Sequence, residues 1–240
     1  MEFRTLKANE IDCRVAQIDK TWCTVLLYKD ARVDMNILDE TVGCMNWAKE
    51  YLRDNANCVV SLWDSEKNQW VSKEDTGTES FSEAEKGLAS DSFKRACFNW
   101  GIGRELYTAP SIFITPRKDI KYRVGGKEVD EFYEYKDGKY TTKTRFWVEL
   151  IDYDKNKRIT DLIIRDNKNN IRFAELTKEK TKKLSDIHSE LKKLIELAED
   201  KDNKFDREKL YEHYKATSDT QMTYDQMQDA IEILKKKVGK

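Results

Sequence analysis

Three strand-like runs in close succession, followed by one long helical pattern, constrain the fold of this chain more than any other feature. The runs cover 44–52, 56–64 and 68–75 and are rich in aromatic and β-branched residues, a composition typical of strands. The polar segment DSEKN between the last two runs has turn chemistry. Because the runs are short and tightly linked, they predict an antiparallel meander.

A long helix is predicted after the meander, from Ser82 to Trp100. Ser82 and Glu85 form a capping-box pattern at its start, and Gly101 ends it. At about 100° per residue, the apolar side chains of this helix fall on one broad face. They are Leu88, Ala89, Phe93, Ala96, Cys97 and Trp100. Two of them are small alanines, so we expect the helix to lie close on the meander as a β-β-β-α core.

The opposite face of the same helix carries a basic pair and an aromatic ring. Phe98 lies at i+4 from Lys94 and at i+3 from Arg95, where helical neighbours meet. One interpretation is that both cations are solvated and that the ring fills space under the next element. The other is a surface for single-stranded nucleic acid, because cations meet phosphates and a ring stacks on any base. Both interpretations stay open from the sequence.

The segments before the meander predict a helix over 6–18, a strand over 21–28 and a second helix that ends at Gly43. In the first segment, Leu6, Ile11 and Val15 are assigned to the buried side of the helix. Asp30 is a suitable cap for the helix that follows the strand.

Residues 111–176 are rich in hairpin signals. A Gly-Gly pair, the Asp137-Gly138 pair and the segment 167–170 each separate alternating runs. Some of these long hairpins could be arms rather than core. From residue 177 the composition changes to charged segments with apolar residues at helical spacing, which predict two or three helices. We therefore expect an α+β domain over 1–176 and a small helical module over 177–240.

The charge of the whole chain gives no support to nucleic-acid binding. Lys and Arg total 44, Asp and Glu total 45, and the net charge is −1. Any such binding must come from a local patch. The two histidines, His188 and His213, both lie in the charged tail, so we expect neither a His-based catalytic site nor a His-rich metal site.

The five cysteines are scattered and form no C-x-x-C pair. Each lies in an apolar run, where a thiol behaves as a small hydrophobe, so we expect reduced thiols in a cytoplasmic protein and no structural zinc. They are Cys13, Cys23, Cys44, Cys58 and Cys97. No run approaches the roughly 20 apolar residues of a membrane span. The start lacks a signal-peptide pattern, and no membrane partner is expected.

Two motif blocks occur in order within residues 6–110. The upstream block places Arg32, Val33, Gly43 and Trp47 between one strand and the next. The downstream block runs through Glu74, Asp75, Gly77, Glu85-Lys86-Gly87, Asp91, Lys94-Arg95-Ala96, Trp100 and Gly101. Together they resemble the Rad-fifty-two-type single-strand DNA annealing family, which includes Sak-like phage recombination proteins. The resemblance covers about residues 6–110 and carries nothing over to residues beyond it.

The resemblance implies that Arg32, Lys94 and Arg95 line an inner groove for single-stranded DNA between helix and sheet. Lys73 and Arg104 are weaker candidates for the same DNA-binding site.

Two of these assignments have alternatives. Family members often have a basic residue where Phe98 stands here, which leaves Phe98 as a stacking or packing substitute. Arg32 could instead form a structural salt bridge, for example to Asp34 or Asp39.

We therefore expect a protein that binds single-stranded DNA and anneals complementary strands without ATP, in homologous recombination or repair. A phage or mobile element would encode it, and it would act in the cytoplasm of a bacterial host. We expect no enzymatic activity, no catalytic residues, no metal and no cofactor; the segment NWGIGRELY lacks the lysine of a P-loop. The resemblance also implies a homo-oligomeric ring or filament. The C-terminal helices could dock a single-strand-binding or replication protein.

Two other function classes stay open. Glu74, Asp75 and Glu79 could hold Mg²⁺ in a nuclease, and metal-dependent cleavage of a labelled strand would support that class. Alternatively, the helical tail could be the working part of an adaptor protein with an incidental basic surface. An adaptor predicts no DNA binding at moderate salt.

Overall fold

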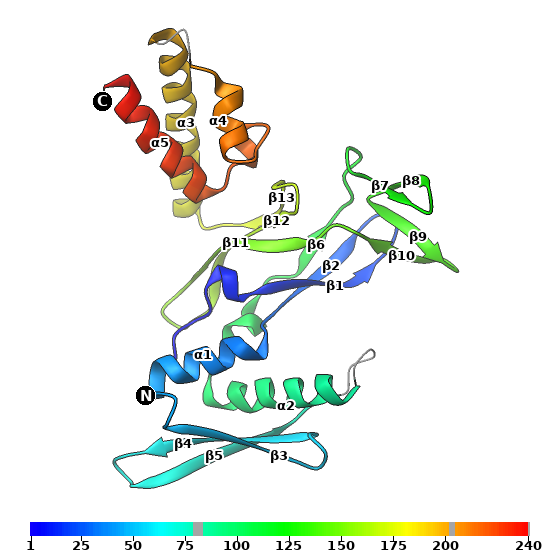
Figure 1. Ribbon diagram of the computed structural model, residues 1–240, viewed down its shortest axis with the longest axis vertical. Helices are drawn as coiled ribbons and strands as arrows, with labels where there is room; N and C mark the ends of the chain where they lie inside the picture. The colour runs from blue at the N-terminus through cyan, green and yellow to red at the C-terminus, as the bar shows by residue number, and fades with distance from the viewer. Residues whose placement is uncertain (79–83, 202–204, 240) are drawn as a thin grey trace. The chain divides into compact units, whose positions relative to one another are not determined.

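The computed structural model describes residues 1–78, 84–201 and 205–239. It is a mixed α+β fold with antiparallel sheets, which confirms the predicted fold class (Figure 1). Contacts between residues divide the chain into two units, whose segments alternate along the sequence. Unit 1 comprises Met1–Asp12, Leu27–Pro110 and Tyr153–Ile159, and unit 2 comprises Cys13–Leu26, Ser111–Asp152 and Thr160–Lys240. A separate domain over 177–240 stays a prediction.

Unit 1 contains the expected meander. Strands β3 (Trp47–Leu52), β4 (Asn57–Asp64) and β5 (Gln69–Thr76) form a three-stranded antiparallel sheet with β4 in the middle. Helix α2 (Ala84–Trp100) packs against β4 and β5, and helix α1 (Ala31–Val42) packs against α2. The β-β-β-α order is therefore confirmed. The capping box of Ser82 and Glu85 lies outside the described residues.

The core of unit 1 lies between α2 and the sheet. Phe93, Ala96 and Cys97 of α2 are fully buried, which confirms this part of the predicted apolar face, whereas Leu88 and Ala89 are only partly buried. Alternate residues of β4 meet them from the sheet, since side chains of a strand point to opposite faces in turn. These are Cys58, Val60 and Leu62. Trp100 is only half-buried, and its indole Nε1 donates to the carbonyl oxygen of Val60 at 3.1 Å.

Helix α1 begins and ends where the sequence predicts. The Asp30 side chain caps it by accepting from the backbone N–H of Arg32, and Gly43 ends it with a positive φ of 85°. Two short 3₁₀ helices, η1 (Ala8–Glu10) and η2 (Arg104–Thr108), also belong to this unit.

The helix predicted over 6–18 is wrong. The chain forms η1 and then strand β1 (Asp12–Ile18), which lies between two other strands of the sheet in unit 2. Cys13 and Val15 alternate with exposed neighbours, so a period of two fits these residues as well as the helical spacing does. Hydrogen bonds to a strand on each side stabilise β1. They outweigh the helical periodicity of the segment, which is only a weak local preference.

Unit 2 is built on a six-stranded sheet in the order β13-β12-β11-β1-β2-β6. The two end strands, β13 and β6, also contact each other, so the sheet nearly closes into a barrel. Besides β1, its strands are β2 (Cys23–Tyr28), β6 (Ile112–Ile114), β11 (Phe146–Tyr153), β12 (Ile159–Asp166) and β13 (Ile171–Glu175). The strand predicted over 21–28 is thereby confirmed.

The predicted hairpins all form. Gly125-Gly126 joins β7 (Lys121–Val124) to β8 (Lys127–Asp130), and Asp137-Gly138 joins β9 (Phe132–Lys136) to β10 (Lys139–Thr142). Each of these two hairpins is a separate two-stranded sheet. The third, β12–β13, is part of the core instead, with Leu162, Ile163 and Ile164 buried. The arm interpretation is therefore wrong for β11–β13.

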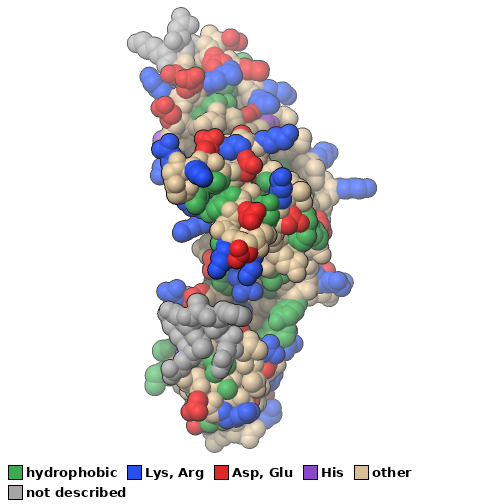
Figure 2. Space-filling model, turned by 90° about the vertical axis from the view of Figure 1, so that its right-hand side faces the viewer, with side chains coloured by type: hydrophobic (Ala, Val, Ile, Leu, Met, Phe, Trp, Pro, Cys, Tyr) green, Lys and Arg blue, Asp and Glu red, His purple; other side chains and the backbone are tan. Residues whose placement is uncertain are grey.

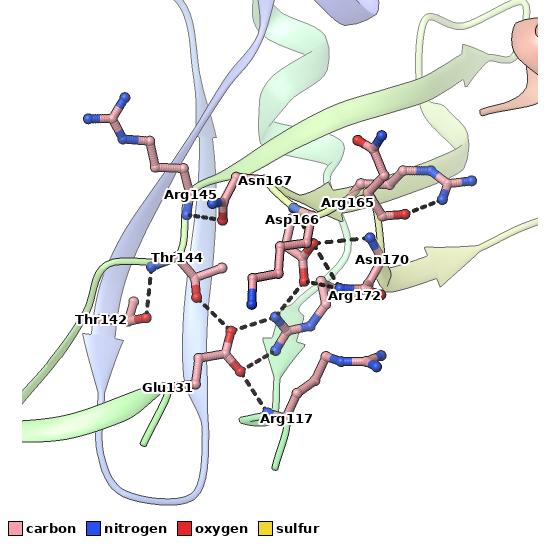
Figure 3. A network of polar contacts seen from close by, with 12 residues as sticks. Arg117, Glu131, Thr142, Thr144, Arg145, Arg165, Asp166, Asn167, Asn170 and Arg172 are labelled. Carbon is pink, nitrogen blue, oxygen red and sulfur yellow. Dashed lines mark hydrogen bonds and ion pairs between the residues drawn. The ribbon is translucent and has the colours of Figure 1, made fainter. Parts of the chain in front are cut away.

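A buried ionic network ties several segments of unit 2 together (Figure 3). The Arg172 guanidinium donates to Glu131 Oε1 at 2.6 Å and to Asp166 Oδ2 at 3.1 Å, and all three side chains are at most 3% exposed. Glu131 also accepts from the Thr144 hydroxyl and from the backbone N–H of Arg117. Because every partner is satisfied, the network is compatible with burial.

The C-terminal helices form as predicted. They are α3 (Lys178–Lys201), α4 (Arg207–His213) and α5 (Tyr224–Val238), and 3₁₀ helix η3 (Asp219–Gln221) precedes α5. Their apolar residues share one hydrophobic core around Leu191, Met222 and Leu234. Arg165 of β12 donates to the carbonyl oxygen of Met222 at 2.9 Å and pairs with buried Glu149. The helices are therefore bonded to the sheet of their own unit as well as to one another.

The cysteines follow the expectation in part. Cys23, Cys58 and Cys97 are buried thiols, and burial raises the pKa of Cys58 to about 11. Cys44 is exposed, contrary to the small-hydrophobe interpretation. Across the described ranges, none of the helices has the length and apolar character needed to cross a bilayer.

Candidate nucleic-acid interface

Helix α2 presents its basic residues outward, as the wheel predicts. Lys94 is half-buried and Arg95 is exposed, while the neighbouring Phe93 and Ala96 are buried against the sheet. The two cations are about 100° apart on the helix, so each meets a different neighbour.

Arg95 lies on the side of α2 that faces β5. Its Nε donates to Asp75 Oδ1 at 3.3 Å, and Asn99 Nδ2 donates to the other oxygen of the same carboxylate at 3.2 Å. Asp75 is therefore shared by two side chains of α2. Because Arg95 is half-exposed and makes one long contact, this ion pair contributes little to stability and leaves the guanidinium within reach of another anion.

Two further cations of the predicted site, Lys73 and Arg104, bind to the last turn of α2. Lys73 Nζ donates to the carbonyl oxygen of Asn99 at 2.8 Å, and its ammonium lies 4.4 Å from the Trp100 ring centroid. Arg104 donates to the carbonyl oxygens of Phe98 and Asn99 at 2.7 and 2.8 Å. Carbonyls at a helix C-terminus lack intrahelical partners and carry partial negative charge, so these cations stabilise the helix end.

Phe98 is packed rather than open. It is half-buried, and its ring centroid lies 4.8 Å from that of Tyr107 and 5.5 Å from the Arg104 guanidinium carbon. The packing interpretation of Phe98 is therefore the one that these contacts favour. Tyr107 covers it from the solvent side and is itself 78% exposed.

Lys94 lies near the start of α1, on the other side of α2. Hydrogen bonds from Arg32 hold the pKa of Asp30 below its usual value, and the Lys94 ammonium lowers it further. Arg32 and Lys94 therefore both act electrostatically on Asp30. Arg32 Nε donates to Asp30 Oδ1 at 2.9 Å, although the Arg32 side chain is 83% exposed.

The alternative interpretation of Arg32 as a salt-bridge residue is confirmed, but its partner is Asp30 rather than Asp34 or Asp39. Asp39 accepts instead from the indole of Trp47 at 2.7 Å.

Asp34 is fully buried and forms an ion pair with Lys29, whose side chain packs against Gly103. Burial raises the pKa of Asp34 to about 6, although Lys29 and Lys94 oppose the shift. Within the described residues, Asp34 Oδ2 has no hydrogen-bond partner.

The sequence did not predict that two further residues, Lys49 and Tyr107, lie near this surface. Lys49 of β3 lies with its ammonium 4.6 Å from the Phe93 ring centroid, on the helix-facing side of the strand. The alternation Trp47, Lys49, Tyr51 is the signal that could have placed it there. Tyr107 has no comparable signal, because its position depends on how the chain turns back after α2.

The acidic residues considered for a metal are otherwise engaged. Asn57 donates to Glu74, and Asp75 accepts from Arg95 and Asn99, while Glu79 lies outside the described residues. Adjacent residues of β5 also point to opposite faces. In the part of the chain that the structure describes, no group of three or more His, Cys, Asp or Glu side chains is arranged to hold a metal ion.

The surface charge is mixed. On the face that Figure 2 shows, Lys and Arg side chains (blue) lie among Asp and Glu side chains (red) rather than in one continuous basic area. This agrees with the net charge of −1. No family model, curated protein or solved structure matches the chain.

Proposed function

We propose that this protein binds single-stranded DNA through the outer face of α2 and anneals complementary strands without ATP. The observation that carries the proposal is the division of α2 into two faces. Phe93, Ala96 and Cys97 are fully buried, whereas Lys94 and Arg95 remain on the solvent side, and the charges of Arg32 and Lys94 both act on Asp30. The resemblance of residues 6–110 to single-strand annealing proteins assigns the same three cations to DNA, but to a groove between helix and sheet. Phe93, Ala96 and Cys97 are buried on that side of α2, so we place the DNA on the outer face instead.

The mechanism needs only binding. Cations along the phosphate backbone reduce repulsion between strands and leave the bases free to test complementarity. Base pairing then supplies the driving free energy, so neither nucleotide hydrolysis nor a catalytic residue is required. Lys73 and Arg104 contribute mainly by fixing the end of α2, since both donate to its last carbonyl oxygens.

Several subunits together would bind DNA more tightly than one subunit, whose net charge is close to zero. Multivalent contact along one strand multiplies weak sites, and we propose a ring or filament of subunits for this reason. The C-terminal helices, which have their own hydrophobic core, are proposed to dock a single-strand-binding or replication protein in the bacterial cytoplasm.

The decisive experiment is annealing of labelled complementary oligonucleotides by a Lys94→Ala, Arg95→Ala double variant. We expect annealing to be lost while the free energy of unfolding is nearly unchanged, because neither side chain is buried. A matched control replaces Lys127 and Lys139, two exposed lysines of the hairpins in unit 2.

Normal annealing by the double variant would contradict the assignment to α2. Equal losses in the variant and its control would point to overall charge instead. Cleavage of the strand with Mg²⁺ would favour the nuclease class.

A further inference from the structure

The region around the end of α2 contains an aromatic residue that the sequence did not single out. Tyr107 is 78% exposed, a larger fraction than for Tyr135 at 59% or Phe113 at 58%. Within the described residues, no hydrogen bond to the Tyr107 hydroxyl is found, and its only ring partner is Phe98. One face of the ring is therefore open to solvent.

The segment that carries Tyr107 is firmly held. In a 3₁₀ helix, residues i and i+3 lie on the same side, so η2 directs Arg104 and Tyr107 one way and Glu105 and Thr108 the other. Glu105 is 2% exposed and accepts from the backbone N–H of Leu6 at 2.8 Å. The Thr108 hydroxyl accepts from the backbone N–H of Ile159 at 2.9 Å. Tyr107 thus stands on a rigid support.

The ring is also supported from below and flanked by a fixed cation. Phe98 backs it at a centroid separation of 4.8 Å and an interplanar angle of 59°. Arg104 is held by two carbonyl oxygens, so its guanidinium stays beside the aromatic pair. Lys94 and Arg95 precede Phe98 on α2 by four and three residues, about one turn of the helix. An exposed ring beside positive charge is the arrangement that single-stranded nucleic acid binds, with bases stacked and phosphates on the cations.

We propose that Tyr107 is the base-stacking residue of this surface, and that Phe98 supports it from beneath without touching the bases. The proposal rests on the proposed function and adds what the cations cannot supply, namely contact with unpaired bases. It predicts a preference for single strands over duplex, because stacked and paired bases offer no free face.

The experiment compares two probes of equal length, oligo(dT) and an oligonucleotide with abasic sites at every position. Fluorescence anisotropy at fixed salt is measured for the full-length protein and for Tyr107→Ala. We expect about tenfold weaker binding of oligo(dT), which corresponds to about 1.4 kcal/mol, and unchanged binding of the abasic strand. Tyr107→Phe should bind as the wild type does. Tyr135→Ala, which removes an exposed tyrosine from unit 2, is the matched control.

The outcomes separate this inference from the proposed function. Equal losses on both probes, or no loss on oligo(dT), would overturn the stacking role while the Lys94→Ala, Arg95→Ala variant still reports on the cations. Failure of the wild-type protein to bind either probe would overturn both. Because Tyr107 is 78% exposed and loses only its ring contact with Phe98, the alanine variant should unfold at a urea concentration only slightly below that of the wild type. A large shift together with equal losses on both probes would assign the residue to packing.

Discussion

Arg104 holds Phe98 in two ways. Its Nε donates to the Phe98 carbonyl oxygen at 2.7 Å, and its guanidinium carbon lies 5.5 Å from the centroid of the same residue's ring. A residue beyond the helix thus closes the helix end and covers an aromatic side chain on it. The cation that the resemblance assigns weakly to DNA consequently has a structural role that can be measured separately.

Replacing Arg104 by alanine should lower the free energy of unfolding by about 1–3 kcal/mol. The change removes charge-assisted hydrogen bonds to two terminal carbonyls of α2 and a cation–π contact. Lysine at the same position should restore only part of the loss, since it lacks the planar fork of donors. Urea unfolding measures the difference, with exposed Arg123→Ala as control. An unchanged midpoint would show that water replaces these bonds at no cost.

Asp75→Asn should increase affinity for single-stranded DNA several-fold. The carboxylate attracts the Arg95 guanidinium at 3.3 Å, and an amide of the same shape would release it while still bonding Asn99. Removing a negative charge from the surface also favours the phosphates. Salt titration of binding checks this, because the gain should shrink as ionic strength rises. Weaker binding would mean that Asp75 orients Arg95 productively.

Gly77→Ala should destabilise the protein by about 3 kcal/mol. A Cβ at this position would lie 2.5 Å from the backbone nitrogen of Ser92 and 2.7 Å from the carbonyl oxygen of Leu88. Backbone atoms of a packed helix cannot yield, so α2 would have to move away from the strand end. Gly138→Ala is the comparison, because there a positive φ of 75° is strained but no atom of the described residues lies within 4 Å. A loss at Gly77 no larger than that at Gly138 in thermal unfolding would show that α2 moves away from the added Cβ at little cost.

The stability of unit 1 should depend on pH through Asp34. Burial raises its pKa from 3.8 to about 6, with Lys29, Lys94 and Cys97 as its charged or titratable neighbours. Between about pH 4 and pH 6 the folded state therefore binds a proton that the unfolded state has released. Stability from this group is fully present below about pH 4 and falls as pH rises through about 6, by at most about 3 kcal/mol.

Asp34→Asn removes that dependence. The free energy of unfolding of the wild type should fall relative to the variant as pH rises from 4 to 6.5, whatever the absolute stability of the variant. Asp30, whose pKa is lowered, acts in the opposite direction and only at lower pH. Parallel pH profiles for the two proteins would refute a titration of Asp34 in this window.

Arg172→Met should cost about 3–5 kcal/mol in unit 2. It leaves Glu131 and Asp166 buried without the cation that both carboxylates share (Figure 3). The double change Arg172→Met with Glu131→Gln should recover part of the loss, because one buried charge disappears with its partner. Chemical denaturation tests these two variants and Glu131→Gln alone, and losses of the two single variants that add up to that of the double variant would show that the two side chains are not coupled.

The sequence alone determined the local structure of most of the chain. The Asp137-Gly138 and Gly125-Gly126 pairs specify tight turns because Gly and Asp adopt positive φ more readily than most residues, and all four have a positive φ in the structure. The spacing of Phe93, Ala96 and Cys97 specified the buried face of α2, and Lys94 and Arg95 followed onto the solvent side. These features depend on neighbours within a few residues, which a sequence displays directly.

Only the tertiary structure decided which distant segments meet. Residues 12–18 form a strand because strands from both halves of the chain pair with them. Arg95 forms an ion pair with Asp75, which lies twenty residues earlier in the sequence. Tyr107 reached Phe98 because the glycines at 101 and 103 adopt positive φ and turn the chain back over the end of α2. Periodicity carries no information on such pairings, since their free energy comes from contacts that exist only after the chain has folded.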